Sequence, residues 1–135
     1  MSYYILYMNR LAKFALTMLV LDYIYLSSFS GQYNNMMKTI QKSPLKMKPL
    51  YALVVYVLMI LGWKLLIDKQ GEKQSKIVRN SIILGLIIYG VFDFTNLAIF
   101  ENYSLKLGLI DMLWGGILFG VSSYIATKKL NLKLY

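Results

Sequence analysis

The chain has 135 residues, of which 58% are hydrophobic and 16% charged, and its formal net charge is +9. Charged residues make up about 25% of an ordinary soluble domain, so this composition excludes that class. The chain contains neither Cys nor His, which excludes disulfides, thiolate nucleophiles, imidazole bases and metal sites built on these residues. The sequence indicates no metal ion or other cofactor.

Four apolar stretches follow one another along the chain, at residues 11–29, 49–67, 81–100 and 105–127. Each is close to the roughly 20 residues that a helix needs to cross a bilayer. The sequence therefore predicts an all-α integral membrane protein, a bundle of four antiparallel transmembrane helices. Little of the chain lies outside these stretches, so we expect residues 1–135 to form a single domain in the lipid bilayer.

The three connections differ in length and character. Residues 30–48 mix Met, Ile and Leu with Lys, a composition that suits a segment lying along the membrane interface. Pro49 is well placed to open the second helix. We expect residues 68–80 to form a polar hairpin turn. The short connection at 101–104 predicts that the third and fourth helices are antiparallel neighbours.

The basic residues indicate an orientation. Lys and Arg gather at the ends of the apolar stretches, where cationic side chains meet lipid headgroups, and we expect no nucleic-acid partner. Ten of the fifteen lie on the side of the termini and the second connection, which favours both termini inside. The five on the other side are Lys38, Lys42, Lys46, Lys48 and Lys106.

Three acidic residues, Asp22, Asp93 and Asp111, lie inside the apolar stretches. A carboxylate in hydrocarbon is costly, so each is a candidate functional residue. Asp22 and Asp93 are seven residues from the predicted outer ends of their helices, and Asp111 is six. At about 1.5 Å per residue all three lie roughly 9–11 Å deep, and Tyr56 reaches the same level on the second helix. These depths predict one polar layer across the bundle.

Helical spacing adds polar and aromatic neighbours to this layer. No Lys or Arg lies at that level, and three nearby carboxylates cannot all be ionised unless a cation accompanies them. Either some are protonated, or a cation or another ligand lies among them. The candidate ligand or proton site comprises Asp22, Tyr56, Tyr89, Asp93, Thr95, Asn96, Asp111 and Trp114.

Two interpretations of the layer remain open. In one, it binds a small polar or cationic species or handles protons. In the other, the protein is a structural or assembly subunit of a larger membrane complex, and the acids join its helices through hydrogen bonds worth roughly 0.6–2 kcal/mol each. A third hypothesis is a lipid-modifying enzyme that uses a carboxylate as acid or base. We find no recognisable catalytic constellation, which favours a protein that is not an enzyme.

The glycines of the last two helices have a simpler explanation. Small residues let the backbones of two membrane helices approach closely. We expect these residues to pack the helices within one bundle, with a homodimer seam as the alternative. The helix-packing candidates are Gly85, Gly90, Gly115, Gly116 and Gly120.

Three segments carry a family resemblance. Residues 89–98 (YGVFDFTNLA), 111–115 (DMLWG) and 21–26 (LDYIYL) closely resemble the signature of small predicted membrane proteins known as domain of unknown function 2177. The family usually has Trp at the place of Tyr25 and a Gly-Trp-Pro turn at residues 102–104, where this chain has Asn-Tyr-Ser. The resemblance implies a four-helix membrane domain, and it supplies no activity.

Overall fold

The computed structural model describes residues 2–129, with side chains from residue 9 onward. This part of the chain consists of four helices without strands, namely α1 (Ser2–Gln41), α2 (Pro49–Leu66), α3 (Gln74–Ile99) and α4 (Leu105–Thr127). Each helix is long and apolar enough to cross a membrane. The predicted all-α class with four membrane-spanning helices is confirmed.

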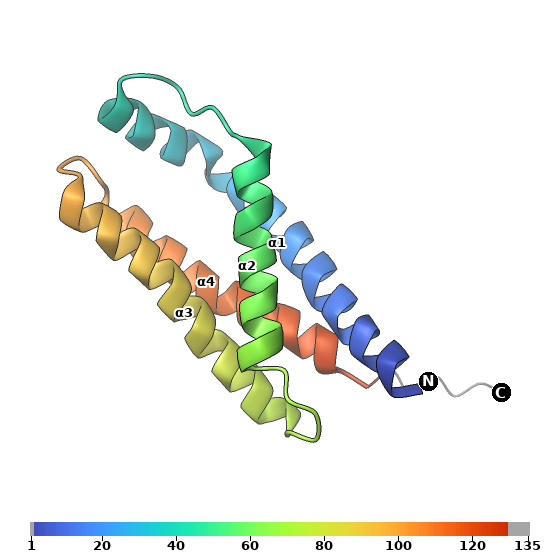
Figure 1. Ribbon diagram of the computed structural model, residues 1–135. Coiled ribbons are helices and arrows are strands. Elements are labelled where there is room, and N and C mark those ends of the chain that lie inside the picture. Colours follow the sequence, from blue (N-terminus) through green and yellow to red (C-terminus); the bar gives the residue numbers. More distant parts are fainter. Residues whose placement is uncertain (1, 130–135) are drawn as a thin grey trace.

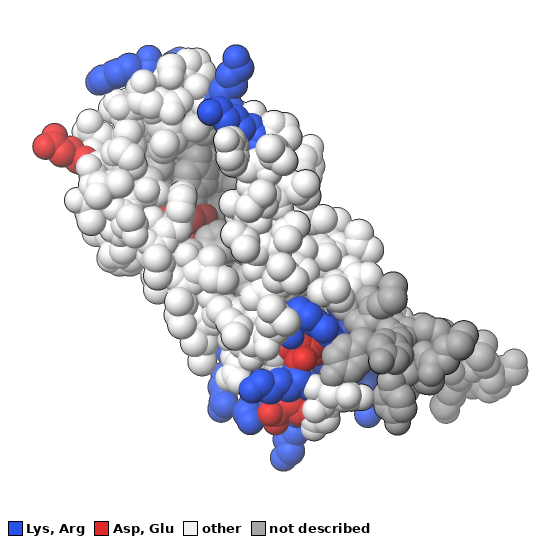
Figure 2. Space-filling view, viewed as in Figure 1, with Lys and Arg blue, Asp and Glu red and all other residues white. Residues whose placement is uncertain are grey.

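The helices run up and down, and their connections lie alternately at the two ends of the molecule (Figure 1). The start of α1, the 67–73 connection and the end of α4 lie at one end, here called the inner end after the predicted orientation. The 42–48 and 100–104 connections lie at the other, the outer end. Lys and Arg gather at both ends around a largely uncharged middle (Figure 2), as expected of a bundle that crosses a bilayer. Lys133, one of the basic residues assigned to the inner side, is outside the described residues.

Helix α1 is longer than predicted. The predicted end of the first helix at Phe29 is wrong, because α1 continues to Gln41 before Lys42 takes a left-handed conformation with φ 63°. No proline interrupts the chain before Pro44, so the helix extends until the residues that precede this proline. The remaining connection folds back on the helix, with Leu45 N donating to Asn34 Oδ1 at 3.2 Å.

The outer part of α1 bends away from the direction of its inner part (Figure 1). The bend lies near a run of small and hydroxyl residues. Ser28 Oγ donates to the Ile24 carbonyl at 2.8 Å and Ser30 Oγ to the Ser27 carbonyl at 3.1 Å, a type of contact that bends helices. As a result Met36 reaches the turn between α3 and α4, where its sulfur accepts a hydrogen bond from the Ser104 backbone N–H at 3.2 Å.

Local sequence explains the other helix ends. Pro49 stands in the first turn of α2, as predicted. Helix α3 begins at Gln74, inside the expected polar hairpin, which leaves 67–73 as the connection, with Gly71 at φ 79°. The Ser104 hydroxyl caps α4 by accepting from Leu107 N at 3.2 Å.

Helices α3 and α4 lie side by side and antiparallel, in close contact. Their packing depends on the absence of side chains at Gly85 and Gly115. A methyl group on Gly115 would lie 2.6 Å from the Gly85 carbonyl oxygen, and one on Gly85 would overlap the Gly115 carbonyl group. A methyl group on Gly116 would lie 3.0 Å from the Leu86 side chain. The other two packing candidates also lie between these helices, Gly90 against Met112 and Gly120 against Ile82.

Aromatic rings fill the inner half of the bundle. Phe14 of α1 stacks on Trp63 of α2 with ring centroids 4.0 Å apart, and Phe119 of α4 meets Phe14 edge-on at 5.8 Å. The Trp63 indole donates to Ser81 Oγ at 3.0 Å and to Ser123 Oγ at 3.2 Å. Leu84, Ile88 and Tyr89 of α3 also pack against this apolar cluster, which therefore joins all four helices.

Candidate functional site

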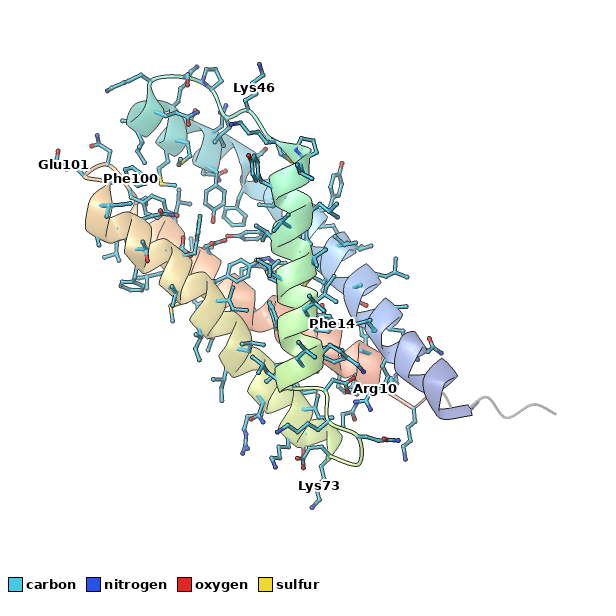
Figure 3. The ribbon with its side chains drawn as sticks, in the orientation of Figure 1. Arg10, Phe14, Lys46, Lys73, Phe100 and Glu101 are labelled. Atoms are coloured by element: carbon cyan, nitrogen blue, oxygen red, sulfur yellow. The ribbon has the colours of Figure 1, made fainter. Side chains whose placement is uncertain are left out.

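A cleft of about 900 Å³ occupies the outer half of the molecule between α1, α2 and α3. Figure 2 shows it as a hollow in the uncharged surface, with acidic atoms visible at its floor. Its walls are mainly apolar, and no Lys or Arg is among the residues that line it. Figure 3 shows the labelled basic side chains away from this region, with Lys46 at the outer connection and Arg10 and Lys73 at the inner end. The polar side chains that line it are Asp22, Ser30, Tyr33, Asn34, Tyr56, Tyr89, Asn96, Tyr103 and Asp111.

Asp22 joins three helices at the floor of the cleft. The Tyr56 hydroxyl of α2 donates to its Oδ2, and the Trp114 indole of α4 donates to its Oδ1 at 3.0 Å. Asp22 is 5% exposed, so both donors replace water that burial has removed. The two donors are neutral, and the carboxylate therefore has hydrogen bonds but no described counter-ion.

Asp111 faces the same cleft from α4. Its Oδ1 accepts a hydrogen bond from the Tyr25 hydroxyl at 3.1 Å, and Tyr25 in turn shares a 2.7 Å hydrogen bond with the hydroxyl of Tyr33. The Tyr25 ring is stacked on Trp114, with centroids 4.7 Å apart and an interplanar angle of 8°. The acid is therefore bonded to Tyr25, and Tyr33, further along α1, holds Tyr25 in place.

Asp93 lies behind the cleft and is fully buried. Its Oδ1 accepts a hydrogen bond from the Tyr103 hydroxyl at 2.7 Å, and its Oδ2 is buried without a hydrogen-bond partner. Its carboxyl group is close enough to that of Asp111 to interact with it. Burial, followed by the hydrogen bond to Asp93, raises the pKa of Tyr103 above its usual value, so this phenol stays a donor at neutral pH. Gly108 leaves room for the acid, since a methyl group there would lie 3.5 Å from Asp93 Cβ.

A model of the family of predicted membrane proteins known as DUF2177 matches residues 3–128. The chain belongs to this family. The matched region contains all four helices from residue 3 on, together with every residue that lines the cleft. A search of curated proteins and a search of solved structures found no match.

The structure brings together most of the predicted layer. Asp22 and Asp111 line one cleft with Tyr56, Tyr89 and Asn96. Of the other three candidates, Asp93 interacts with Asp111 and Trp114 donates to Asp22, while the side chain of Thr95 is exposed on α3. Two residues along a helix correspond to a rotation of about 200°, so Thr95 points nearly opposite to Asp93.

Three residues with buried polar contacts were missed in the sequence, two of them at the site and one at the inner end. Tyr33 lies eight residues after Tyr25, on the same helical face, but the predicted end of the first helix placed it in a connection. Tyr103 lies in the outer turn, where the sequence departs from the family pattern. Asp68 is buried at the inner end, where it forms ion pairs with Lys64 at 2.7 Å and with Arg10 at 2.5 Å. The spacing of four residues between Lys64 and Asp68 could have indicated this ion pair in the sequence.

The chemistry of the cleft is that of an acidic acceptor site with aromatic walls. Carboxylates accept hydrogen bonds from ammonium groups, and the faces of tyrosine rings attract cations. The cleft volume falls within the range of about 300–1,000 Å³ that is usual for small-molecule sites. The arrangement therefore suits an organic group that carries positive charge and hydrogen-bond donors.

Proposed function

We propose that this integral membrane protein binds a small cationic polar group in the outer-half cleft, with Asp111 and Asp22 as acceptors. The observation that carries the proposal is that the cleft reaches two carboxylates while none of its lining residues is Lys or Arg. Buried acids without cations are costly. A ligand that supplies the positive charge would offset part of the free-energy cost of burying these carboxylates. That gain would be the source of its affinity.

The two acids have different roles in this proposal. Asp22 already accepts hydrogen bonds from Tyr56 and Trp114, so it holds the helices around the site and contributes negative charge. Asp111 accepts one described hydrogen bond, from Tyr25, and lines the cleft. It is therefore the main ligand acceptor.

The second candidate function is a structural or assembly subunit whose acids only connect helices. The hydrogen bonds from Tyr56 and Trp114 to Asp22 favour it, because they join α1, α2 and α4. The two functions make opposite predictions for Asp111. An amide at this position lowers stability if the acid is only a connector. If the acid is a ligand acceptor beside Asp93, the amide leaves stability unchanged or raises it, because functional acids are often kept at the expense of stability.

The test compares n-alkylamines with alcohols of the same chain length, using protein in nanodiscs of zwitterionic lipid. The proposal predicts that amines stabilise the protein, by about 2.7 kcal/mol when the ligand concentration is 100 times Kd, and that the alcohols do not. The stabilisation should disappear in Asp111→Asn, which serves as the control for effects of amines on the bilayer. Equal effects of amines and alcohols, or of amines on both proteins, would refute cation binding.

A further inference from the structure

The cleft is shaped for a ligand that resides in the membrane. We propose, resting on the function above, that the ligand is an amphiphile with one cationic amine headgroup at Asp111 and an apolar chain. The chain leaves the cleft sideways, between α2 and α3, into the outer leaflet. Three features of the cleft fit such a ligand, namely where it opens, how deep it reaches and how polar and apolar side chains are distributed along its lining.

The opening lies between two helices that do not pack closely on each other. Helix α2 contacts α1, and α3 contacts α4, whereas α2 and α3 have few close approaches. Val55 of α2 and Phe92 of α3 both line the cleft, yet they are 52% and 59% exposed. These residues therefore stand at a lateral mouth. Figure 2 shows the hollow opening through the uncharged band that faces lipid.

The depth of the cleft matches one leaflet. Its innermost lining residue on α2 is Met59, ten residues after Pro49, where α2 begins at the outer end. Ten residues of helix span about 15 Å, which is half of the roughly 30 Å hydrocarbon core. Below this level Phe14, Trp63 and Phe119 fill the bundle. The cleft therefore extends through the outer leaflet and ends near the middle of the membrane.

The lining of the cleft is acidic at its floor and mainly apolar elsewhere. Leu26, Met37, Leu45, Val55 and Ile88 are among the apolar lining residues, and no basic side chain accompanies them. A small hydrophilic cation would contact the acids but leave these walls uncovered, and from the mouth it would have to cross lipid. An anionic lipid would place its charge beside the carboxylates. A cationic amphiphile matches both parts of the cleft.

A bare metal ion is a poorer match. Among residues 2–129 no group of three acidic side chains is arranged to hold a metal ion. The hydrogen bonds to Asp22, Asp93 and Asp111 come from hydroxyl and indole donors, which already occupy part of each carboxylate. An ammonium group needs fewer acceptors, and the surrounding tyrosine rings add cation–π attraction.

The experiment uses dodecylamine with a diazirine at the end of its chain, crosslinked by light to the full-length protein in zwitterionic nanodiscs. Mass spectrometry should locate the label on α2 and α3 near Val55 and Phe92, and unlabelled dodecylamine should compete for it. Val55→Trp fills the mouth and should reduce labelling at least tenfold. The matched control is Val57→Trp, since Val57 is exposed on α2 and does not line the cleft, and its labelling should equal that of the wild type. Unfolding midpoints establish that both variants are folded.

Each result favours or overturns the inference. Label spread over all lipid-facing helices, or unchanged labelling in Val55→Trp, refutes the lateral mouth. If butylamine competes as well as dodecylamine at equal mole fraction in the membrane, the ligand is a small polar cation, and only the proposed function survives. If dodecanol competes as well as dodecylamine, the charge is irrelevant and the proposed function fails instead.

Discussion

Replacing Gly85 with alanine places a methyl group where α3 and α4 touch. The new Cβ would overlap the Gly115 carbonyl group and lie 2.9 Å from Phe119 Cβ. The first obstacle is backbone, which cannot move aside as a flexible side chain does, so the two helices must separate. Overpacking of this kind costs about 1–3 kcal/mol, and separation also loosens the contacts that follow along the helix pair.

Two other glycines supply matched controls for the helix propensity of alanine, which is worth up to about 1 kcal/mol over glycine. A methyl group on Gly62 of α2 meets nothing within 4 Å, so Gly62→Ala should be neutral or stabilising. At Gly90 the nearest atoms belong to the end of the Met112 side chain, at 3.1 Å. This thioether is adaptable, so Gly90→Ala should be close to neutral.

The assay is unfolding by SDS in mixed lipid–detergent micelles, followed by tryptophan fluorescence. We expect Gly85→Ala to be less stable than wild type by about 2 kcal/mol, and less stable than Gly62→Ala by about 3 kcal/mol. The order of stability should be Gly62→Ala, then Gly90→Ala, then Gly85→Ala. If Gly85→Ala unfolds at the same SDS fraction as Gly62→Ala, α3 and α4 are not packed through this glycine and the reasoning is wrong.

Three further variants test other parts of the bundle with the same assay. Tyr56→Phe should lower stability by about 0.6–1.7 kcal/mol, the range for interhelical hydrogen bonds in membranes. This loss should be largely absent when Asp22 has already been replaced by Asn. If the losses of the two variants add up in the double variant, Tyr56 and Asp22 are not directly bonded. Asp68→Asn should cost about 2–3 kcal/mol, because it removes the buried acid that pairs with Arg10 and Lys64 at the inner end. Glu72→Gln, at an exposed ion pair, is its control and should change nothing measurable, so equal losses would refute the argument. Trp63→Phe keeps the ring stack but removes the donor to two serines, and it should cost about 1–2 kcal/mol. A Trp63→Phe variant as stable as the wild type would show that these hydrogen bonds are not formed.

The depth of a residue in the membrane was predictable wherever the outer end of its helix was placed correctly. A fixed rise per residue converts distance from a helix end into depth, and on this basis Asp22, Tyr56, Asp93 and Asp111 were expected at one level. Asp22, Tyr56 and Asp111 line one cleft, whereas Asp93 is buried behind it. Rotation around the helix was less secure, because Thr95 was grouped with Asp93 by nearness in sequence, although helical geometry turns it away.

The end of α1 shows the limit of hydropathy. The residues after Phe29 are more polar, and this fall in hydropathy predicted a connection, yet the backbone stays helical to Gln41. Polar residues do not stop a helix by themselves, whereas proline does. The error mattered for the site, because it removed Tyr33 from the helical face that carries Asp22 and Tyr25.

The sequence by itself determined that this is a membrane protein with four helical spans and intramembrane acids, because segment length and apolar composition are local properties that the bilayer thickness makes decisive. Only the tertiary structure decided which acid each aromatic donor meets and that a cleft exists. Those features depend on contacts between side chains distant in sequence, such as Tyr25 with Asp111, and on the separation of α2 from α3. Glycines hold α3 and α4 together, the Phe14–Trp63 stack anchors α2 at the inner end, and the outer half between α2 and α3 is left open.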